Sequence, residues 1–181
     1  RAGNPFVTST LSEQALIKAR SVAADLYLTD FQDLYLELSM HKADEALVAE
    51  DVNNIGPYRA QLIKAINLLK HTVTELAKGS YDGVLSSSDE LLEPLHACYN
   101  SLCNNGMEAV AKSMVVDIIR RIKCFGISLI KLDIRQHSER HDDAMGEVTQ
   151  ALGLGNYAKW TEEEKQGFLL QELANPRPFL P

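Results

Sequence analysis

One short stretch, residues 130–135, alternates between apolar and charged side chains. This two-residue period is typical of a β-strand, in which successive side chains point to opposite faces. The apolar set is Ile130, Leu132 and Ile134, and the charged set is Lys131, Asp133 and Arg135. The remaining sequence predicts helices, and a single strand cannot satisfy its own backbone hydrogen-bonding groups. We therefore expect this strand to pair with strands outside the chain, so that the 181 residues are part of a larger protein.

The charged face of the predicted strand is suited to binding an anion. Side chains two residues apart on a strand lie about 7 Å from one another, so Asp133 can orient Arg135. A buried guanidinium held in this way binds phosphate or carboxylate through paired hydrogen bonds. Ser138 predicts the N-cap of a helix beginning at Glu139, and β/α folds place ligand-binding residues between strand and helix. A purely structural ion pair is the alternative that residue chemistry leaves open.

Apolar residues at three- and four-residue spacing predict a series of amphipathic helices. The signals at their ends include Pro57 at a first turn, Gly79 at a helix end, and capping boxes that pair Ser87 with Glu90 and Thr161 with Glu164. The expected helices cover residues 11–40, 57–79, 87–104, 110–123, 139–152 and 161–173. The chain is thus predicted to be mainly α.

Composition and charge exclude several classes of protein. The net charge of −7 argues against a nucleic-acid surface, because duplex binding needs a basic patch. We find no signal peptide, lipidation signal or apolar run of membrane-spanning length, and expect a cytoplasmic protein without membrane contact. The three cysteines lack the paired spacing of a zinc site, which favours reduced thiols. His137 and His141 have no third ligand nearby, so we expect no metal site on this chain.

Four stretches of the sequence carry the motifs of one enzyme family. Residues 123–126 read KCFG, residues 132–136 read LDIRQ, and SERH follows at 138–141. Residues 1–8 are similar to a GGDRDGNP-x-VT loop cut at its arginine, and residues 93–102 to an EPL-x-ACY-x-SL segment. Together, and in this order, the motifs resemble those of bacterial-type phosphoenolpyruvate carboxylases. The resemblance runs from the first residue to the last, and only the combination of motifs is specific.

The resemblance implies a large, mostly helical enzyme built around an eight-stranded β-barrel and assembled as a tetramer. Such enzymes use Mg²⁺ or Mn²⁺ to add bicarbonate to phosphoenolpyruvate, which gives phosphate and the oxaloacetate that feeds the tricarboxylic acid cycle. Residues 1–181 are then an internal fragment of the barrel region and its helical elaborations. We expect a mainly α chain whose one or few strands belong to the (β/α)8-type barrel of the parent enzyme. A cytoplasmic, allosterically regulated parent is implied as well.

The resemblance also assigns residues. Arg135 matches the family arginine that binds the substrate phosphate, and we infer that Asp133 orients it. Arg1 and Asn4 match the active-site loop and are candidates for catalysis. Ala2 departs from the pattern, since the family has Asp there. Three explanations are open: the enzyme differs at this position, the residue was altered, or the contacts of the loop are not the usual ones. A role for Arg1 depends on which of them is correct.

Arg59 is a candidate for an allosteric site. It lies within a segment similar to the family's EPYR motif, whose arginine is associated with a sugar-phosphate activator site in plant members. This chain has Gly56 where the family often has Glu. A solvated surface arginine is the alternative.

The family's TAHPTE, FHGRGG and GYSDS-x-KD motifs are not present in these 181 residues. In the family, the last two regions supply the carboxylates that bind the metal and further groups that bind phosphate. We therefore expect the ligands of Mg²⁺ or Mn²⁺ to lie outside this chain. We also expect the isolated chain to be inactive. Expected partners are phosphoenolpyruvate, bicarbonate and the remainder of the parent chain. A helical scaffold that binds partners through its amphipathic faces is the alternative from another class, but it does not explain the charged strand face.

Overall fold

The computed structural model describes residues 7–133, 135 and 137–175. This part of the chain is mainly helical, which confirms the predicted fold class. It forms two compact units, a helical bundle that ends at Leu132 and a smaller helical unit that begins at Asp133.

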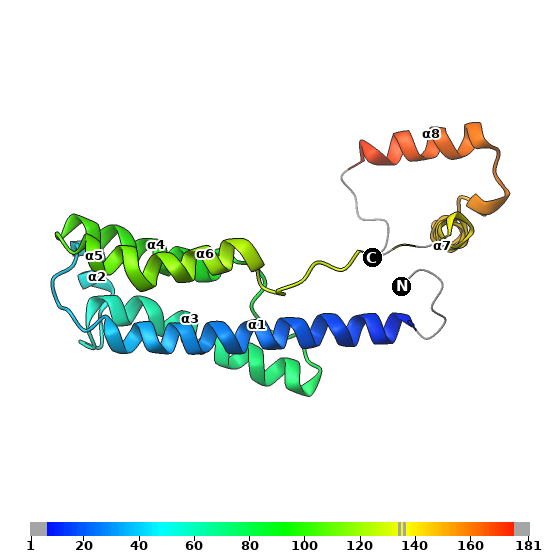
Figure 1. Ribbon diagram of the computed structural model, residues 1–181. Helices are drawn as coiled ribbons and strands as arrows, with labels where there is room; N and C mark the ends of the chain where they lie inside the picture. The colour runs from blue at the N-terminus through cyan, green and yellow to red at the C-terminus, as the bar shows by residue number, and fades with distance from the viewer. Residues whose placement is uncertain (1–6, 134, 136, 176–181) are drawn as a thin grey trace. The chain divides into compact units, whose positions relative to one another are not determined.

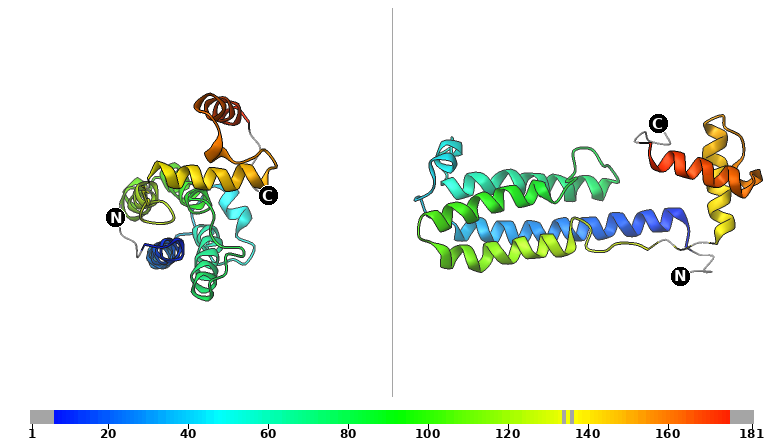
Figure 2. Two further views of the ribbon diagram at one scale, coloured as in Figure 1. Left: turned by 90° about the vertical axis from the view of Figure 1, so that its right-hand side faces the viewer. Right: turned by 90° about the horizontal axis from the view of Figure 1, so that it is seen from above.

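Four long helices make up the body of the bundle. They are α1 (Ser9–Glu37), α3 (Pro57–Lys78), α4 (Asp89–Asn104) and α6 (Val116–Phe125). The four run side by side, with α1 packed on α3, α3 on α4 and α4 on α6 (Figures 1 and 2). The short helices α2 (Glu45–Glu50) and α5 (Glu108–Val110) connect them, and α2 was not predicted. The buried apolar side chains of all four long helices form one continuous core.

Local side-chain signals set several helix ends. Pro57 opens α3, and Gly79 ends it in the left-handed conformation, φ 75°, as its sequence signal predicts. The capping box predicted from Ser87 and Glu90 differs from the observed start of α4, because the N-cap is Ser88 and not Ser87. Glu90 Oε1 nevertheless accepts from the backbone N–H of Ser87 at 2.9 Å. The N-cap of α1 is Thr8, whose hydroxyl accepts from the Leu11 N–H.

The helix predicted at 110–123 is not continuous. A π-helical turn, η1 (Ala111–Val115), separates α5 from α6, and Ser113 has non-helical angles, φ −85° and ψ −107°. A π-turn adds a residue to the helix and rotates the positions before it. Ala111 and Val115 are therefore buried, whereas Val110 and Met114, which would share the buried side with Ile118 and Ile122 in an uninterrupted helix, are exposed.

The predicted strand at 130–135 is not formed in the described residues. Residues 130–133 and Arg135 are irregular backbone after α6 (Figure 1), and Ile134 lies outside the described residues. A strand is defined by hydrogen bonds to a neighbouring strand, and the described part of this chain contains no second strand to supply them. The expectation that partner strands lie outside this chain stays a prediction.

The smaller unit consists of α7 (Ser138–Ala151), a 3₁₀ turn η2 (Tyr157–Lys159) and α8 (Glu162–Leu173). The rings of Tyr157, Trp160 and Phe168 pack together with centroids 5.3 to 6.3 Å apart. The predicted capping box of α8 is present, since the Thr161 hydroxyl accepts from the Glu164 N–H and the Glu164 carboxylate from the Thr161 N–H. Ser138, predicted as the N-cap of α7, is instead its first residue.

No helix within the described ranges combines the length and apolar character that crossing a membrane requires.

Candidate functional site

The segment that carries the predicted substrate arginine begins at Gly126, directly after α6. This glycine ends α6 with φ 60° and ψ −155°, and its N–H donates to the Ile122 carbonyl at 2.8 Å. Its own carbonyl accepts a hydrogen bond from the Tyr27 hydroxyl at 2.7 Å. Residues Ile127 and Leu129 then lie partly buried against the bundle core. The chain therefore remains attached to the bundle for several residues beyond the end of α6.

Asp133 and Arg135 form the ion pair that the sequence predicts. The Arg135 Nε donates to Asp133 Oδ2 at 2.6 Å. The guanidinium is not buried as expected, however: the Arg135 side chain is 79% exposed and that of Asp133 is 68% exposed. A guanidinium is buried in a barrel only when neighbouring strands surround it, and the described residues of this chain form no strand. Because Asp133 engages Nε, a phosphate would be bound through the terminal Nη1 and Nη2 atoms.

The other two catalytic candidates, Arg1 and Asn4, lie outside the described residues. Their assignment to an active-site loop stays a prediction, as does the consequence of Ala2.

Arg59 is half-buried and holds the end of α1. Its Nε donates to the Tyr35 carbonyl at 2.9 Å and its Nη2 to the Leu36 carbonyl at 3.4 Å. The guanidinium also lies over the Tyr35 ring, 5.2 Å from the centroid. A cation is favoured at a helix carboxyl end because the last carbonyls have no intrahelical partner. These contacts give Arg59 a structural role, and its place in an activator site stays a prediction.

Within the described ranges, no three His, Cys, Asp or Glu side chains lie close enough together to bind a metal ion. His137 is the N-cap of α7 and His141 lies in the first turns of that helix.

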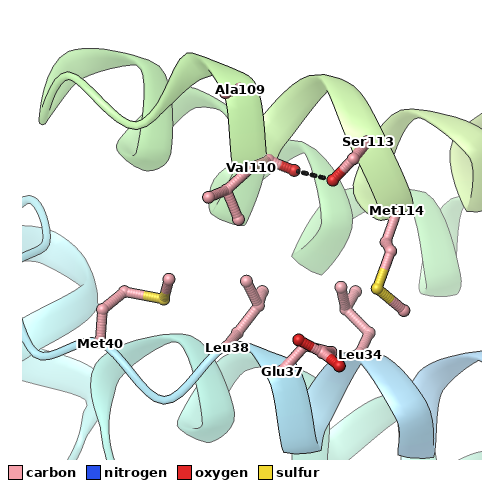
Figure 3. A pocket seen from close by; sticks show the side chains of 8 residues that line it. All are labelled: Leu34, Glu37, Leu38, Met40, Ala109, Val110, Ser113 and Met114. Carbon is pink, nitrogen blue, oxygen red and sulfur yellow. Dashed lines mark hydrogen bonds between the residues drawn. The ribbon is translucent and has the colours of Figure 1, made fainter.

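A hollow of about 390 Å³ lies between the end of α1 and the π-turn. Leu34 and Leu38 face Val110 and Met114 across it (Figure 3), and Glu37 is the charged residue of its lining. The lining has no cation, so the hollow does not suit a phosphorylated substrate. Sequence periodicity gave no sign of it, because the hollow depends on the rotation that the π-turn introduces.

Two contacts between α1 and α6 were also missed by sequence reasoning. One is the Tyr27–Gly126 hydrogen bond, and the other is an ion pair between Asp30 and Arg121 at 2.5 Å. Burial raises the pKa of Tyr27, and the nearby Asp30 and Cys124 raise it further. No local pattern signals such contacts, because the partners are far apart in the sequence.

The described residues thus form a mainly helical chain with an exposed aspartate–arginine ion pair in a non-helical segment. The family model described as phosphoenolpyruvate carboxylase matches residues 1–181. The chain belongs to the phosphoenolpyruvate carboxylase family, in agreement with the motifs of its sequence.

Individual relatives agree with the family match. The chain is 46% identical over 188 residues to a phosphoenolpyruvate carboxylase of Psychromonas ingrahamii. It is 45% identical over 187 residues to that of Tolumonas auensis, and 44% over 187 residues to that of Hahella chejuensis. Each alignment covers 100% of this chain and 21% of the relative. The chain thus spans about a fifth of the length of these curated relatives, which confirms that it corresponds to one part of such an enzyme.

Proposed function

We propose that this chain supplies a phosphate-binding arginine to a longer enzyme that adds bicarbonate to phosphoenolpyruvate, giving oxaloacetate and phosphate. The observation that carries the proposal is the Asp133–Arg135 ion pair, because it lies within the LDIRQ stretch that resembles the family motif. The names of the relatives and the family match support the reaction. The alternative of a helical scaffold is not favoured, since it explains neither the family match nor the names of the relatives.

The proposed role of Arg135 is to hold the phosphoryl group of the substrate. A guanidinium is always charged and binds two phosphate oxygens at once, which suits the negative charge on a transferring phosphoryl group. Asp133 fixes Nε and so turns the Nη1 and Nη2 atoms outward. The same carboxylate would prevent rotation of the guanidinium when the substrate binds.

The exposure of Arg135 bears on what the isolated chain can do. An exposed ion pair in water contributes about 1 kcal/mol or less, because solvent screens the charges. The same contact is much stronger in a site from which water is excluded. We therefore propose that the rest of the longer protein encloses Arg135, and that the 181-residue chain alone is inactive.

A divalent metal fits the proposed reaction but not the described residues of this chain, which bring no three suitable ligands together. Mg²⁺ or Mn²⁺ would be held by residues elsewhere in the longer protein. We further propose, from the family resemblance, that Arg1 and Asn4 belong to the active-site loop and Arg59 to an activator site. On the same basis, we propose that the longer enzyme is a cytoplasmic, allosterically regulated tetramer.

An assay of the longer protein tests the role of Arg135. Oxaloacetate formation is followed by coupled reduction to malate, with wild type, Arg135→Ala and a matched control, Arg120→Ala. Arg120 is also an exposed arginine, 73% accessible, and pairs with Asp117 on α6 at 3.5 Å. Arg135→Ala should lower kcat/KM by a factor of about 100 or more, equivalent to roughly 3 kcal/mol of transition-state stabilisation. Arg120→Ala should leave it unchanged.

The proposal fails if wild type forms no oxaloacetate, or if Arg135→Ala stays within twofold of wild type. Activity of the isolated 181-residue chain would contradict the statement that Arg135 needs the rest of the protein.

A further inference from the structure

The hollow between the end of α1 and the π-turn is large enough to bind a small molecule. Its volume of about 390 Å³ falls within the range of about 300 to 1,000 Å³ that is usual for ligand pockets. Leu34 and Leu38 form one wall, and Val110 and Met114 form the other (Figure 3). All of its lining residues belong to the helical bundle, so the hollow is defined within one compact unit.

The walls of the hollow are apolar, and part of them can adapt to a ligand. Leu34 and Leu38 are buried in the bundle core, which fixes the wall that α1 supplies. Met40 and Met114 lie at the two ends of the hollow (Figure 3). A methionine side chain is flexible and polarizable, so it can adjust to the shape of an apolar ligand.

The opposite wall exists because of the π-turn. The turn leaves Val110 and Met114 at the hollow, each 36% exposed, while their neighbours fill the core. The Ser113 hydroxyl donates to the Val110 carbonyl at 2.9 Å, and its oxygen can still accept a hydrogen bond. π-helical turns occur frequently at functional sites.

The charge in the lining of the hollow is negative. Glu37 shares one face of α1 with Leu34 and Leu38, because positions three and four apart are neighbours on a helix. Its carboxylate forms an ion pair with no described residue, and the last turn of α1 contains no basic residue. The carboxyl end of a helix adds a partial negative charge of its own.

The cations of the surrounding elements leave this carboxylate unpaired. Lys112 pairs with Glu108 at 2.9 Å. Arg59 donates to carbonyls at the end of α1, and Lys42 does not line the hollow. A bound cation would therefore not compete with a lysine or arginine of the described residues.

We propose that the hollow binds a small organic cation, with an apolar body between the two walls and an ammonium group at Glu37. The apolar body is stabilised by its removal from water, and the ammonium group by a charge-assisted hydrogen bond to the carboxylate. Glu37 repels an anion, and a wholly apolar molecule makes no use of its charge. The inference does not depend on the proposed role of Arg135.

The test uses the full-length protein with carbon-13 in its methionine methyl groups, and tryptamine as the probe. Tryptamine joins an indole ring to an ammonium group, and the matched probe, indole-3-propionate, joins the same ring to a carboxylate. The NMR signals of Met40 and Met114, identified with the variants Met40→Leu and Met114→Leu, report binding at the hollow itself. Both should shift with tryptamine and reach saturation, and indole-3-propionate should bind about fivefold more weakly or less.

Substitutions separate the charge of the site from its shape. Glu37→Gln removes the charge, keeps the size, and should weaken tryptamine binding about three- to fivefold without weakening that of indole-3-propionate. The matched control Glu93→Gln changes an exposed carboxylate of α4 that does not line the hollow, and should alter neither affinity. Val110→Phe takes up space in the hollow and should weaken both probes.

Methionine signals that do not respond to tryptamine would overturn the proposal, and this result is expected if the longer protein covers the hollow with its own chain. Equal affinity for the two probes, or unchanged tryptamine affinity in Glu37→Gln, would show a hollow that holds apolar molecules regardless of charge. Either result would refute the cation site. None of these measurements requires oxaloacetate formation, so failure here is distinguishable from failure of the proposed function.

Discussion

The three cysteines of the chain lie in three different environments. Cys98 is buried within α4, Cys103 is half-buried in the same helix, and Cys124 is exposed in the last turn of α6. Burial raises the pKa of the Cys98 thiol to about 12. Since the thiolate is the nucleophile, burial and a raised pKa both make Cys98 unreactive in the folded chain.

We expect iodoacetamide at pH 8 to modify Cys124 at least tenfold faster than Cys98 in the native chain. Mass spectrometry of peptides at successive times would measure both rates. In a parallel sample unfolded in urea, the two cysteines should react at similar rates. Native labelling of Cys98 as fast as Cys124 would show that α4 is not packed as described.

Arg59 shows how one residue admits different interpretations. Its motif suggests an activator site, yet its guanidinium donates to the carbonyls of Tyr35 and Leu36 at the end of α1. Substitution of a residue that stabilises a helix end can reduce the stability of the protein and, through it, the regulation of its activity. Loss of activation in an Arg59 variant would therefore identify an activator site only if the bundle remained equally stable.

At the scale of elements, the two helices of the smaller unit begin differently. α8 has a complete capping box from Thr161 and Glu164, whereas α7 begins at Ser138 with no side-chain hydrogen bond at its N-cap, His137. A side-chain cap stabilises a helix because it pairs an N–H group that otherwise has no intrahelical partner. The two helices thus provide an internal comparison.

Thr161→Ala should destabilise α8 by about 1 kcal/mol, the usual effect of losing an N-cap. Amide hydrogen exchange along α8 would measure the change, and the matched substitution Ser138→Ala should leave exchange in α7 nearly unaffected. A larger effect from Ser138→Ala than from Thr161→Ala would contradict the assigned caps.

The π-turn is the element that sequence periodicity predicted least well. The spacing of Val110, Met114, Ile118 and Ile122 suits one uninterrupted helix. Ile118 and Ile122 are buried as expected, but within the turn the buried positions move by one residue to Ala111 and Val115. The shift depends on how α4 and α5 pack on this turn, which no short window of sequence contains.

At the scale of the whole chain, α1 exposes several large apolar side chains. Its buried stripe includes Tyr27, Phe31 and Leu34, and at about 100° per residue Leu11, Val22, Leu26 and Leu36 lie away from this stripe. Leu16 is exposed as well, although it lies on the side of the stripe. Exposed apolar side chains in such number are typical of a surface that further protein covers, which agrees with a chain that spans about a fifth of the length of its relatives.

We expect the isolated chain to self-associate through these exposed apolar side chains of α1, since exposed apolar surface favours association. Sedimentation velocity over a range of concentrations should show species larger than the 20.1 kDa monomer. The variant Leu26→Glu/Leu36→Glu should shift the distribution toward monomer, and Val52→Glu, which changes an exposed loop residue, should not. A strictly monomeric wild type would rule out this prediction.

The helices and many of their ends were determined by the sequence itself. Pro57, Gly79 and the pair of Thr161 and Glu164 act on backbone groups within a few residues, and helix hydrogen bonds join residues only four apart. The ion pair of Asp133 and Arg135 could be predicted for the same reason, because its partners are two residues apart.

Tertiary structure decided what depends on partners distant in the sequence. The segment at 130–135 has the pattern of a strand, but strand pairing needs a neighbour that the described part of this chain lacks, and for the same reason Arg135 is exposed. Only the packing of α1 against α6 brings the Tyr27 hydroxyl to the Gly126 carbonyl across 99 residues. Contacts of this kind arise when helices meet, so no local pattern of residues predicts them.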